Sequence, residues 1–227
     1  VQRPTENSLG QPIHSTEDGI RNFWRWFGDS KVVDSEGRPL VVYHGTVLDN
    51  GEEPFSEFRT GELGVHFGTE EQALKRANRF SNIKSIDTNT RPHLYQVYLQ
   101  ISNYIYTWSD ARNWSIGTDL EKVLHKSGTL SKEESESIDW GKEQNEIRDE
   151  IVSLGYDGIK YSNSFEGKGD SYIVFYPDQI KSATENDGSF NPKSNDIKFS
   201  SSNKTSNRTT LNPSSSKMEK AEVEQYV

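Results

Sequence analysis

Leu40-Val41-Val42-Tyr43-His44-Gly45-Thr46 is the most informative stretch of this sequence. Its apolar start is typical of a β-strand, and Pro39 suits the first position of a strand. The strand is expected to end at His44 and to place an imidazole at that end. Gly45 has no side chain, so a ligand could approach its backbone amide and carbonyl closely. An ordinary histidine entering a turn explains the same pattern, so the stretch alone does not define a site.

A second segment, Gly64-Val65-His66-Phe67-Gly68-Thr69, has a similar design, with a histidine next to an aromatic residue. Thr69 can cap a helix with its hydroxyl, and Glu70 and Glu71 suit the first helical turn. Three apolar residues then follow at helical spacing: Leu74, Ala77 and Phe80. The segment therefore predicts a strand, a short turn and a helix.

A third apolar segment covers residues 171–176 and stops at Pro177. It follows a glycine-rich loop that contains Glu166. If the three segments are neighbouring strands, they bring two imidazoles and one carboxylate together. The predicted constellation is His44, His66 and Glu166.

The order of these motifs resembles that of ADP-ribosyltransferase domains, in particular the transferase-like domains in polyvalent proteins of phages and other mobile elements. Two further sequence segments match these domains: Trp26-Phe27-Gly28-Asp29-Ser30-Lys31-Val32-Val33-Asp34 and Pro177-Asp178-Gln179-Ile180-Lys181-Ser182-Ala183. The likeness extends over residues 16–200. It implies an α+β fold of ADP-ribosyltransferase type, with two packed, mainly antiparallel sheets, flanking helices and a central NAD cleft.

The resemblance also implies roles for individual residues. In this family the first-strand histidine holds a ribose, the glycine after it binds the nicotinamide amide through its backbone, and an aromatic residue on the second strand stacks on the ring. Here His44, Gly45 and His66 occupy these places. Three neighbours are expected to complete the NAD site: Tyr43, Thr46 and Phe67.

Two positions depart from the pattern of the eukaryotic poly(ADP-ribose) polymerases. Those enzymes usually have tyrosine where this chain has His66, which is smaller and can titrate near neutral pH. The acid that begins their last strand aligns with Ser171, which cannot supply a negative charge. Glu166, in the phrase Asn163-Ser164-Phe165-Glu166, resembles the phage-type relatives and is the first candidate for the catalytic acid. Asp170 is the second, and a solvated loop acid is the alternative reading of Glu166.

The resemblance implies a mono-ADP-ribosyltransferase that uses NAD as substrate and transfers ADP-ribose to a macromolecular acceptor, with protein favoured over nucleic acid. A phage or bacterial effector or toxin is the corresponding biological setting. Two alternatives remain open. One is a catalytically weak module that binds NAD, ADP-ribose or a nucleic-acid end, and the other is an NAD glycohydrolase with water as acceptor.

Composition limits the remaining possibilities. The 227 residues contain no cysteine, which excludes disulfides, thiolate nucleophiles and cysteine zinc sites. The formal net charge of -9 disfavours broad nonspecific binding to nucleic acid. His14, His93 and His125 share no ligand spacing, so no metal site is expected. No run approaches the roughly 18 apolar residues of a membrane span. No membrane partner is therefore expected, and the predicted location is the cytoplasm of the producing or the target cell.

The element pattern predicts one domain over residues 15–200, between a flexible N-terminal arm (1–14) and a disordered linker or tail (201–227). A helix capped by Ser15 or Thr16 should bury one stripe of residues, Ile20, Phe23, Trp24 and Phe27. Residues 31–33 and 40–42 should pair around a turn, and residues 94–101 should form a long strand, with 104–106 as a candidate continuation. A capping box at Ser131 and Glu134 should begin a helix that runs towards Leu154, followed by a short strand at 158–161.

Overall fold

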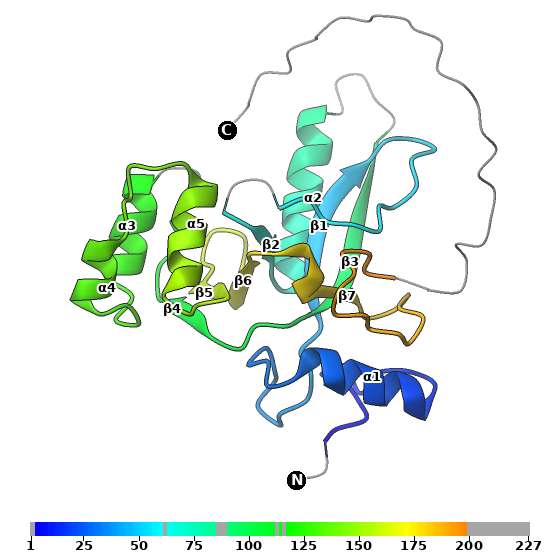
Figure 1. The fold of residues 1–227 in the computed structure, drawn as a ribbon. Coiled ribbons are helices and arrows are strands. Elements are labelled where there is room, and N and C mark those ends of the chain that lie inside the picture. Colours follow the sequence, from blue (N-terminus) through cyan, green and yellow to red (C-terminus); the bar gives the residue numbers. More distant parts are fainter. Residues whose placement is uncertain (1–2, 61–62, 85–89, 112–113, 115–116, 199–227) are drawn as a thin grey trace, which may run out of the picture.

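Two β-sheets form the centre of the chain in the computed structural model, which describes residues 3–60, 63–84, 90–111, 114 and 117–198 (Figure 1). The first sheet has the strand order β1-β3-β7 and is antiparallel throughout. Its strands are β1 (Val42–Leu48), β3 (Arg91–Leu99) and β7 (Ile180–Ser182). Each sheet turns one face towards the other, where buried residues of both form a shared core.

The second sheet has the order β2-β6-β5-β4, with one parallel pair between β4 and β5. Its strands are β2 (Val65–Phe67), β4 (Tyr104–Thr107), β5 (Gly158–Ser162) and β6 (Asp170–Val174). Three helices cover its other face: α3 (Gly117–His125), α4 (Lys132–Ser137) and α5 (Gln144–Ser153). The predicted α+β fold with two mainly antiparallel sheets and flanking helices is confirmed.

The first sheet is covered by α1 (Glu17–Phe27) and α2 (Glu70–Lys84). Thr16 caps α1 by accepting a hydrogen bond from the Gly19 amide, as predicted. Phe23 and Phe27 are buried and their rings stack at 4.9 Å between centroids. The predicted apolar stripe therefore faces the core.

Strand β1 does not end at His44 but continues to Leu48, which corrects the prediction from the sequence. All seven of its residues pair with β3, from Val42 opposite Val97 to Leu48 opposite Arg91. Pairing with a long partner strand keeps the backbone extended through Gly45, although glycine weakens a strand by itself. The residues before β1 pair with 31–33 only at a single bridge, Val33 to Pro39.

The chain after β3 also differs from the prediction. The Asp157 carboxylate accepts hydrogen bonds from the amides of Ser102 and Asn103, each at 2.8 Å, and so holds a turn there. Residues 104–107 therefore cross to the second sheet and pair with β5 rather than continuing β3.

The capping box at Ser131 is confirmed, but the helix that follows is short. Ile138 leaves the helical conformation, and the Asp139 side chain accepts a bond from Gly141 N in the turn that separates α4 from α5. The single helix predicted between Ser131 and Leu154 is thus two. The short strand predicted at 158–161 is confirmed as β5.

Residues 3–14 lie against the domain, in contrast to the flexible arm expected from their polarity. Asn7 donates to the buried Tyr98 hydroxyl at 2.9 Å, and Ile13 is 3% exposed. The segment joins the core around α1 and β3. The domain limits at 15 and 200 stay predictions, and the predicted tail at 201–227 lies outside the described residues.

Helix α2 and strand β1 approach each other at Gly45. A Cβ atom added there would lie 1.8 Å from the carbonyl oxygen of Ala73. Any side chain would force the helix away from the sheet, so the glycine is required by packing.

We predict that Gly45→Ala lowers the free energy of unfolding by about 1 to 3 kcal/mol, the usual range for an overpacked core. Chemical denaturation would measure it. Gly141→Ala is the matched control, because its Cβ would meet only the flexible Asp139 carboxylate, at 3.3 Å. Equal losses in the two variants would contradict the packing argument.

Candidate active site

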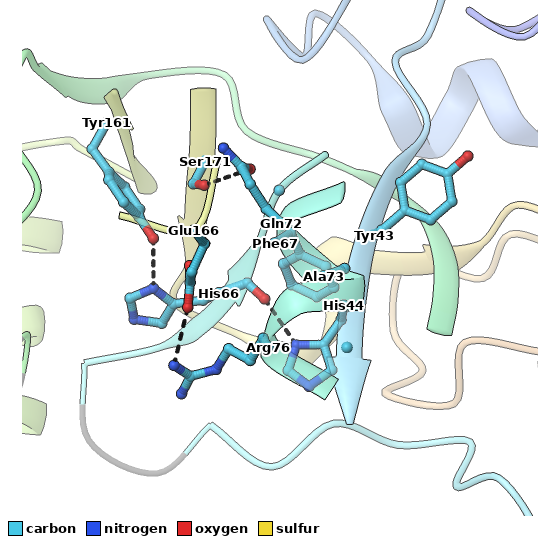
Figure 2. Close-up of a pocket in the computed structure, with 12 residues that line it drawn as sticks. Tyr43, His44, His66, Phe67, Gln72, Ala73, Arg76, Tyr161, Glu166 and Ser171 are labelled. Atoms are coloured by element: carbon cyan, nitrogen blue, oxygen red, sulfur yellow. Dashed lines mark hydrogen bonds and ion pairs between the residues drawn. The ribbon is translucent and has the colours of Figure 1, made fainter. Parts of the chain in front are cut away.

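An open pocket lies where β1 and β2 meet, next to the start of α2 (Figure 2). Residues from both sheets, from α2 and from the 163–169 loop line it. They are Tyr43, His44, Gly45, His66, Phe67, Gly68, Gln72, Ala73, Arg76, Tyr161, Glu166 and Ser171. The three predicted segments therefore contribute to one pocket, with His44, His66 and Glu166 all in its wall.

His44 is held by the second sheet. Its Nδ1 lies 2.8 Å from the carbonyl oxygen of His66. A carbonyl only accepts, so Nδ1 carries the proton, and a neutral ring keeps Nε2 as an acceptor. The pKa of His44 lies below its ordinary value, mainly because the ring is buried. The hydrogen bond to His66 raises this pKa, and the positive charge of Arg76 lowers it further. The ring is therefore neutral at pH 7.

Gly45 presents its backbone to the pocket. Tyr43 exchanges two backbone hydrogen bonds with Gly68, at 2.8 and 2.9 Å, on the side of β1 away from β3. In an extended strand the amide and carbonyl of residue i+2 point the same way. The amide and carbonyl of Gly45 are therefore directed to the same side as those of Tyr43, towards the pocket that Gly45 lines.

His66 is packed between aromatic side chains. Its Nδ1 lies 3.1 Å from the Tyr161 hydroxyl, and the Trp114 ring contacts it at 5.8 Å between centroids. Burial is the main cause that lowers the pKa of His66 to about 3; the charge of Arg76 and, at acid pH, that of His44 add to it. Burial also raises the pKa of Tyr161, which keeps its phenol protonated. The second histidine is thus neutral and fixed in orientation.

Glu166 supplies the only carboxylate among the residues that line this pocket. Its side chain is 21% exposed, and Oε1 lies 3.4 Å from Nη1 of Arg76. Asn163 Nδ2 donates to Oε2 at 2.8 Å. Figure 2 shows the carboxylate pointing towards Arg76, on the same side of the pocket as His66.

Asp170, the second candidate acid, points elsewhere. Its carboxylate forms an ion pair with Lys160 at 2.9 Å and does not line the pocket. Ser171, the next residue on β6, is directed into the pocket wall, because successive side chains of a strand alternate between faces. The geometry therefore favours Glu166 over Asp170 as the acid of this pocket.

The three other predicted NAD-site residues differ in position. The ring of Tyr43 points away from the pocket (Figure 2) and packs in the core next to α1. Phe67 is buried, with its ring 5.6 Å from that of His44, and forms part of the wall. Thr46 does not line the pocket; on β1 it lies opposite His93 of β3.

Sequence reasoning missed three polar residues of the site, Gln72, Arg76 and Asn163. Gln72 and Arg76 are one turn apart on α2, so both face the pocket. Asn163 lies behind Glu166 and is buried. A signal for Gln72 was present, because it stands three residues after Thr69 in a capping-box position. The Gln72 side chain accepts from Thr69 N at 2.8 Å.

Within the described residues, no cluster of three or more histidine, aspartate and glutamate side chains is arranged to hold a metal ion. The pocket instead combines two neutral imidazoles, a directed backbone amide and carbonyl, and one carboxylate beside an arginine. Such a site suits a polar organic substrate that carries or develops positive charge.

A two-sheet α+β domain with this arrangement fits the ADP-ribosyltransferase class. The family model for ADP-ribosyltransferases in polyvalent proteins matches residues 34–190. The chain therefore belongs to this family. No curated protein and no solved structure matched in the corresponding comparisons.

The low pKa of His66 predicts a measurable pH dependence of stability. A histidine with a folded-state pKa near 3 contributes stability above its unfolded value of about 6.5, and this contribution is lost as the pH falls towards 3. Between pH 7 and pH 5 the unfolded state takes up the proton first. The free energy of unfolding should therefore fall by about 2 kcal/mol more in the natural chain than in His66→Gln.

Chemical denaturation of both proteins at pH 7, 6 and 5 would measure this difference. The carboxylates and the other histidines are common to both chains, so their contributions cancel to first order. Parallel pH curves for the two proteins would contradict a neutral, buried His66.

Proposed function

We propose that the domain binds NAD in this pocket, breaks the bond between nicotinamide and ribose, and transfers ADP-ribose to a macromolecular acceptor. NAD is a substrate in this reaction, not a resident cofactor. The observation that carries the proposal is the convergence of His44, His66 and Glu166 on one pocket, in a chain that belongs to an ADP-ribosyltransferase family.

The charges of the pocket suit this chemistry. The nicotinamide ring of NAD is positively charged before cleavage, and the ribose becomes oxocarbenium-like as the bond breaks. Protonated histidines would repel both, whereas the two imidazoles are neutral because burial lowers the pKa of each. Glu166 then supplies the negative charge that stabilises the developing cation.

Four of the predicted residues receive a role in this proposal. His44 accepts a hydrogen bond from a ribose hydroxyl through Nε2, and Gly45 binds the nicotinamide carboxamide through its amide and carbonyl. The His66 ring contacts the nicotinamide. Glu166 accepts a bond from the ribose 2′-hydroxyl, which strengthens as the sugar becomes positive.

The reaction balances without any oxidant or metal. The bond between ribose C1′ and the nicotinamide nitrogen breaks, and its electron pair leaves with the neutral nicotinamide. A nucleophilic atom of the acceptor forms the new bond to C1′ and releases its proton to solvent. Arg76 contacts Glu166 at the rim, and its side chain is half exposed, so it can adjust when substrate binds.

A protein acceptor is favoured over nucleic acid, because the chain has a net charge of -9. None of the described helices is long and apolar enough to cross a membrane. A cytoplasmic effector or toxin, acting in the producing or the target cell, is the setting that the polyvalent family suggests.

One alternative function has a specific observation behind it. Ser171 stands where the polymerase-type relatives carry their acid, and Glu166 already bonds Asn163 and Arg76. A domain that binds NAD or ADP-ribose with little turnover would tolerate this arrangement. Hydrolysis of NAD with water as acceptor uses the same residues and differs only in the nucleophile.

We predict that NAD raises the melting temperature of the domain and that His44→Ala removes most of the rise. Ligand present at about 100 times its Kd stabilises a folded protein by about 2.7 kcal/mol. Thermal denaturation with and without NAD measures the effect. His125→Ala is the control, since His125 bonds Ser135 among the helices of the second sheet. A full shift in His44→Ala would place the ligand elsewhere.

We further predict that Glu166→Gln lowers the turnover number by about a hundred- to a thousandfold, the usual effect of removing one preorganised charge-stabilising group. Binding should persist, because the amide keeps the shape. Asp170→Asn is the control and should change the rate by at most a few fold.

The assay follows nicotinamide release at saturating NAD, with isotopically labelled NAD and a cell lysate as source of acceptors. Label in the protein fraction supports a protein acceptor. Label in the nucleic-acid fraction shows instead that the acceptor is a nucleic acid. Release without label transfer indicates hydrolysis. If the natural chain releases no nicotinamide, the binding module is the correct function.

A further inference from the structure

We infer that Asn163, Ser171 and Gln72 form a positioning network that places the Glu166 carboxylate for catalysis. The inference rests on the proposed function and adds residues to which no role has been given. All three side chains are at least 97% buried, whereas the carboxylate they support lies in the pocket wall.

Asn163 fixes Glu166 at both ends. Its Oδ1 accepts hydrogen bonds from the backbone amides of Phe165, at 3.1 Å, and Glu166, at 3.0 Å. Its Nδ2 donates to Oε2 of the Glu166 carboxylate at 2.8 Å. One side chain therefore sets both the backbone position and the rotamer of the acid, which would otherwise be mobile on a glycine-rich loop.

Ser171 anchors Asn163 to the sheet. The second contact of Asn163 Nδ2 is to Ser171 Oγ, at 3.1 Å. The serine hydroxyl in turn donates to Oε1 of Gln72 at 3.0 Å. Position 171 lies between a donor, Asn163 Nδ2, and an acceptor, Gln72 Oε1, and a hydroxyl can accept from the one and donate to the other. A carboxylate at 171 would set two acceptors against each other and add a second negative charge behind Glu166.

Gln72 closes the network around the loop. Its Nε2 donates to the carbonyls of Gly167, at 3.3 Å, and Gly169, at 3.2 Å. Its Oε1 accepts from Ser171 and from Thr69 N. A Cβ at Gly68 would lie 2.2 Å from this Oε1, so that glycine provides the space for the amide. The loop is thus tied to the first turn of α2 and to the start of β6.

Every polar atom of the three side chains has a partner, so the network is rigid. Its direct contact with the Glu166 carboxylate is the bond from Asn163. By the resemblance to the polymerases, Ser171 stands at the position where those enzymes have their acid. In this geometry the serine instead supports an acid that the loop supplies.

The test is a double-mutant cycle on nicotinamide release by the full chain, with Asn163→Ala, Glu166→Gln and the double variant. A residue that acts through Glu166 loses its effect once the carboxylate is gone. Asn163→Ala should lower kcat by about 10- to 100-fold, the usual cost of removing a supporting hydrogen bond. It should change KM less than threefold, and its additional effect on Glu166→Gln should be under about threefold.

Asn163→Asp separates the two halves of the asparagine's contribution. It keeps the acceptor for the two backbone amides and removes the donor to the carboxylate, so the loop is retained while the acid is no longer held. We expect a loss of kcat at least as large as in Asn163→Ala. Ser171→Ala, which removes only the anchor, should lower kcat by about 10-fold, the lower end of the same range. If Asn163→Ala does not fold, Asn163→Asp and Ser171→Ala are used in its place.

Asn186 offers a matched control. Its Oδ1 also accepts from two backbone amides, those of Gly188 and Phe190, and its Nδ2 donates to the Ile197 carbonyl. It is equally a buried loop asparagine, but it does not line the pocket. Asn186→Ala should lower the melting temperature as much as Asn163→Ala and leave kcat per folded molecule within twofold.

Three outcomes would overturn the inference: additive losses in the double variant, a loss confined to KM, or an equal loss of kcat in Asn186→Ala. They differ from a failure of the proposed function. In that case the natural chain releases no nicotinamide, or Glu166→Gln remains fully active, and the positioning role falls together with the catalytic one.

Discussion

Tyr43 and Gly68 exchange two backbone hydrogen bonds, at 2.8 and 2.9 Å, and the arrangement of the pocket depends on this pair. The pair joins the edge strand of one sheet to the end of β2 in the other. It brings His44, which follows Tyr43, close to His66, two residues before Gly68, so that Nδ1 of His44 bonds the carbonyl of His66. Gly68 permits this contact, because a side chain there would occupy the place of the Gln72 amide. The same junction therefore sets the geometry of both histidines and of the helix start beside them.

This junction also determines the electrostatics. The two imidazoles lie partly buried between the sheets, and this burial lowers both pKa values, so no positive charge arises on either ring at neutral pH. The charged groups among the pocket-lining residues are Glu166 and Arg76, which face each other at 3.4 Å. In the proposed reaction, positive charge that develops on the sugar meets one carboxylate and uncharged rings. Neutral histidines are thus a requirement of the proposed chemistry and a direct result of the packing.

The sequence predicted those features that depend on short-range patterns. Three such predictions were confirmed, and each rests on residues close together in the sequence. They are the apolar stripe of α1, the succession of strand β2, the cap residue Thr69 and helix α2, and the capping box at Ser131. The length of β1 and the course of the chain after β3 were predicted wrongly, because partner strands and Asp157 determine them from far along the chain. The separation of α4 from α5 was missed although its cause, the turn around Asp139, is local.

The same distinction applies to the site. His44, His66 and Glu166 could be selected because each stands in a recognisable motif, and the structure brings them to one pocket. The bond between Gln72 and Ser171 joins residues 99 positions apart, which no local pattern reveals. Asn163 is different, since its contacts to Phe165 and Glu166 form a local asparagine turn that the phrase Asn163-Ser164-Phe165-Glu166 already contained.

An acid on a loop needs support that an acid on a strand receives from the ladder itself. In this chain the support is a buried polar network, and such a network is favourable only when every member is satisfied. Removing one of its side chains leaves its buried neighbours without partners and releases the carboxylate at the same time. Stability of the 163–169 loop and placement of Glu166 are therefore the same physical property of this fold. A serine at position 171 is consistent with the proposed site, because Gln72 and Asn163 accompany it.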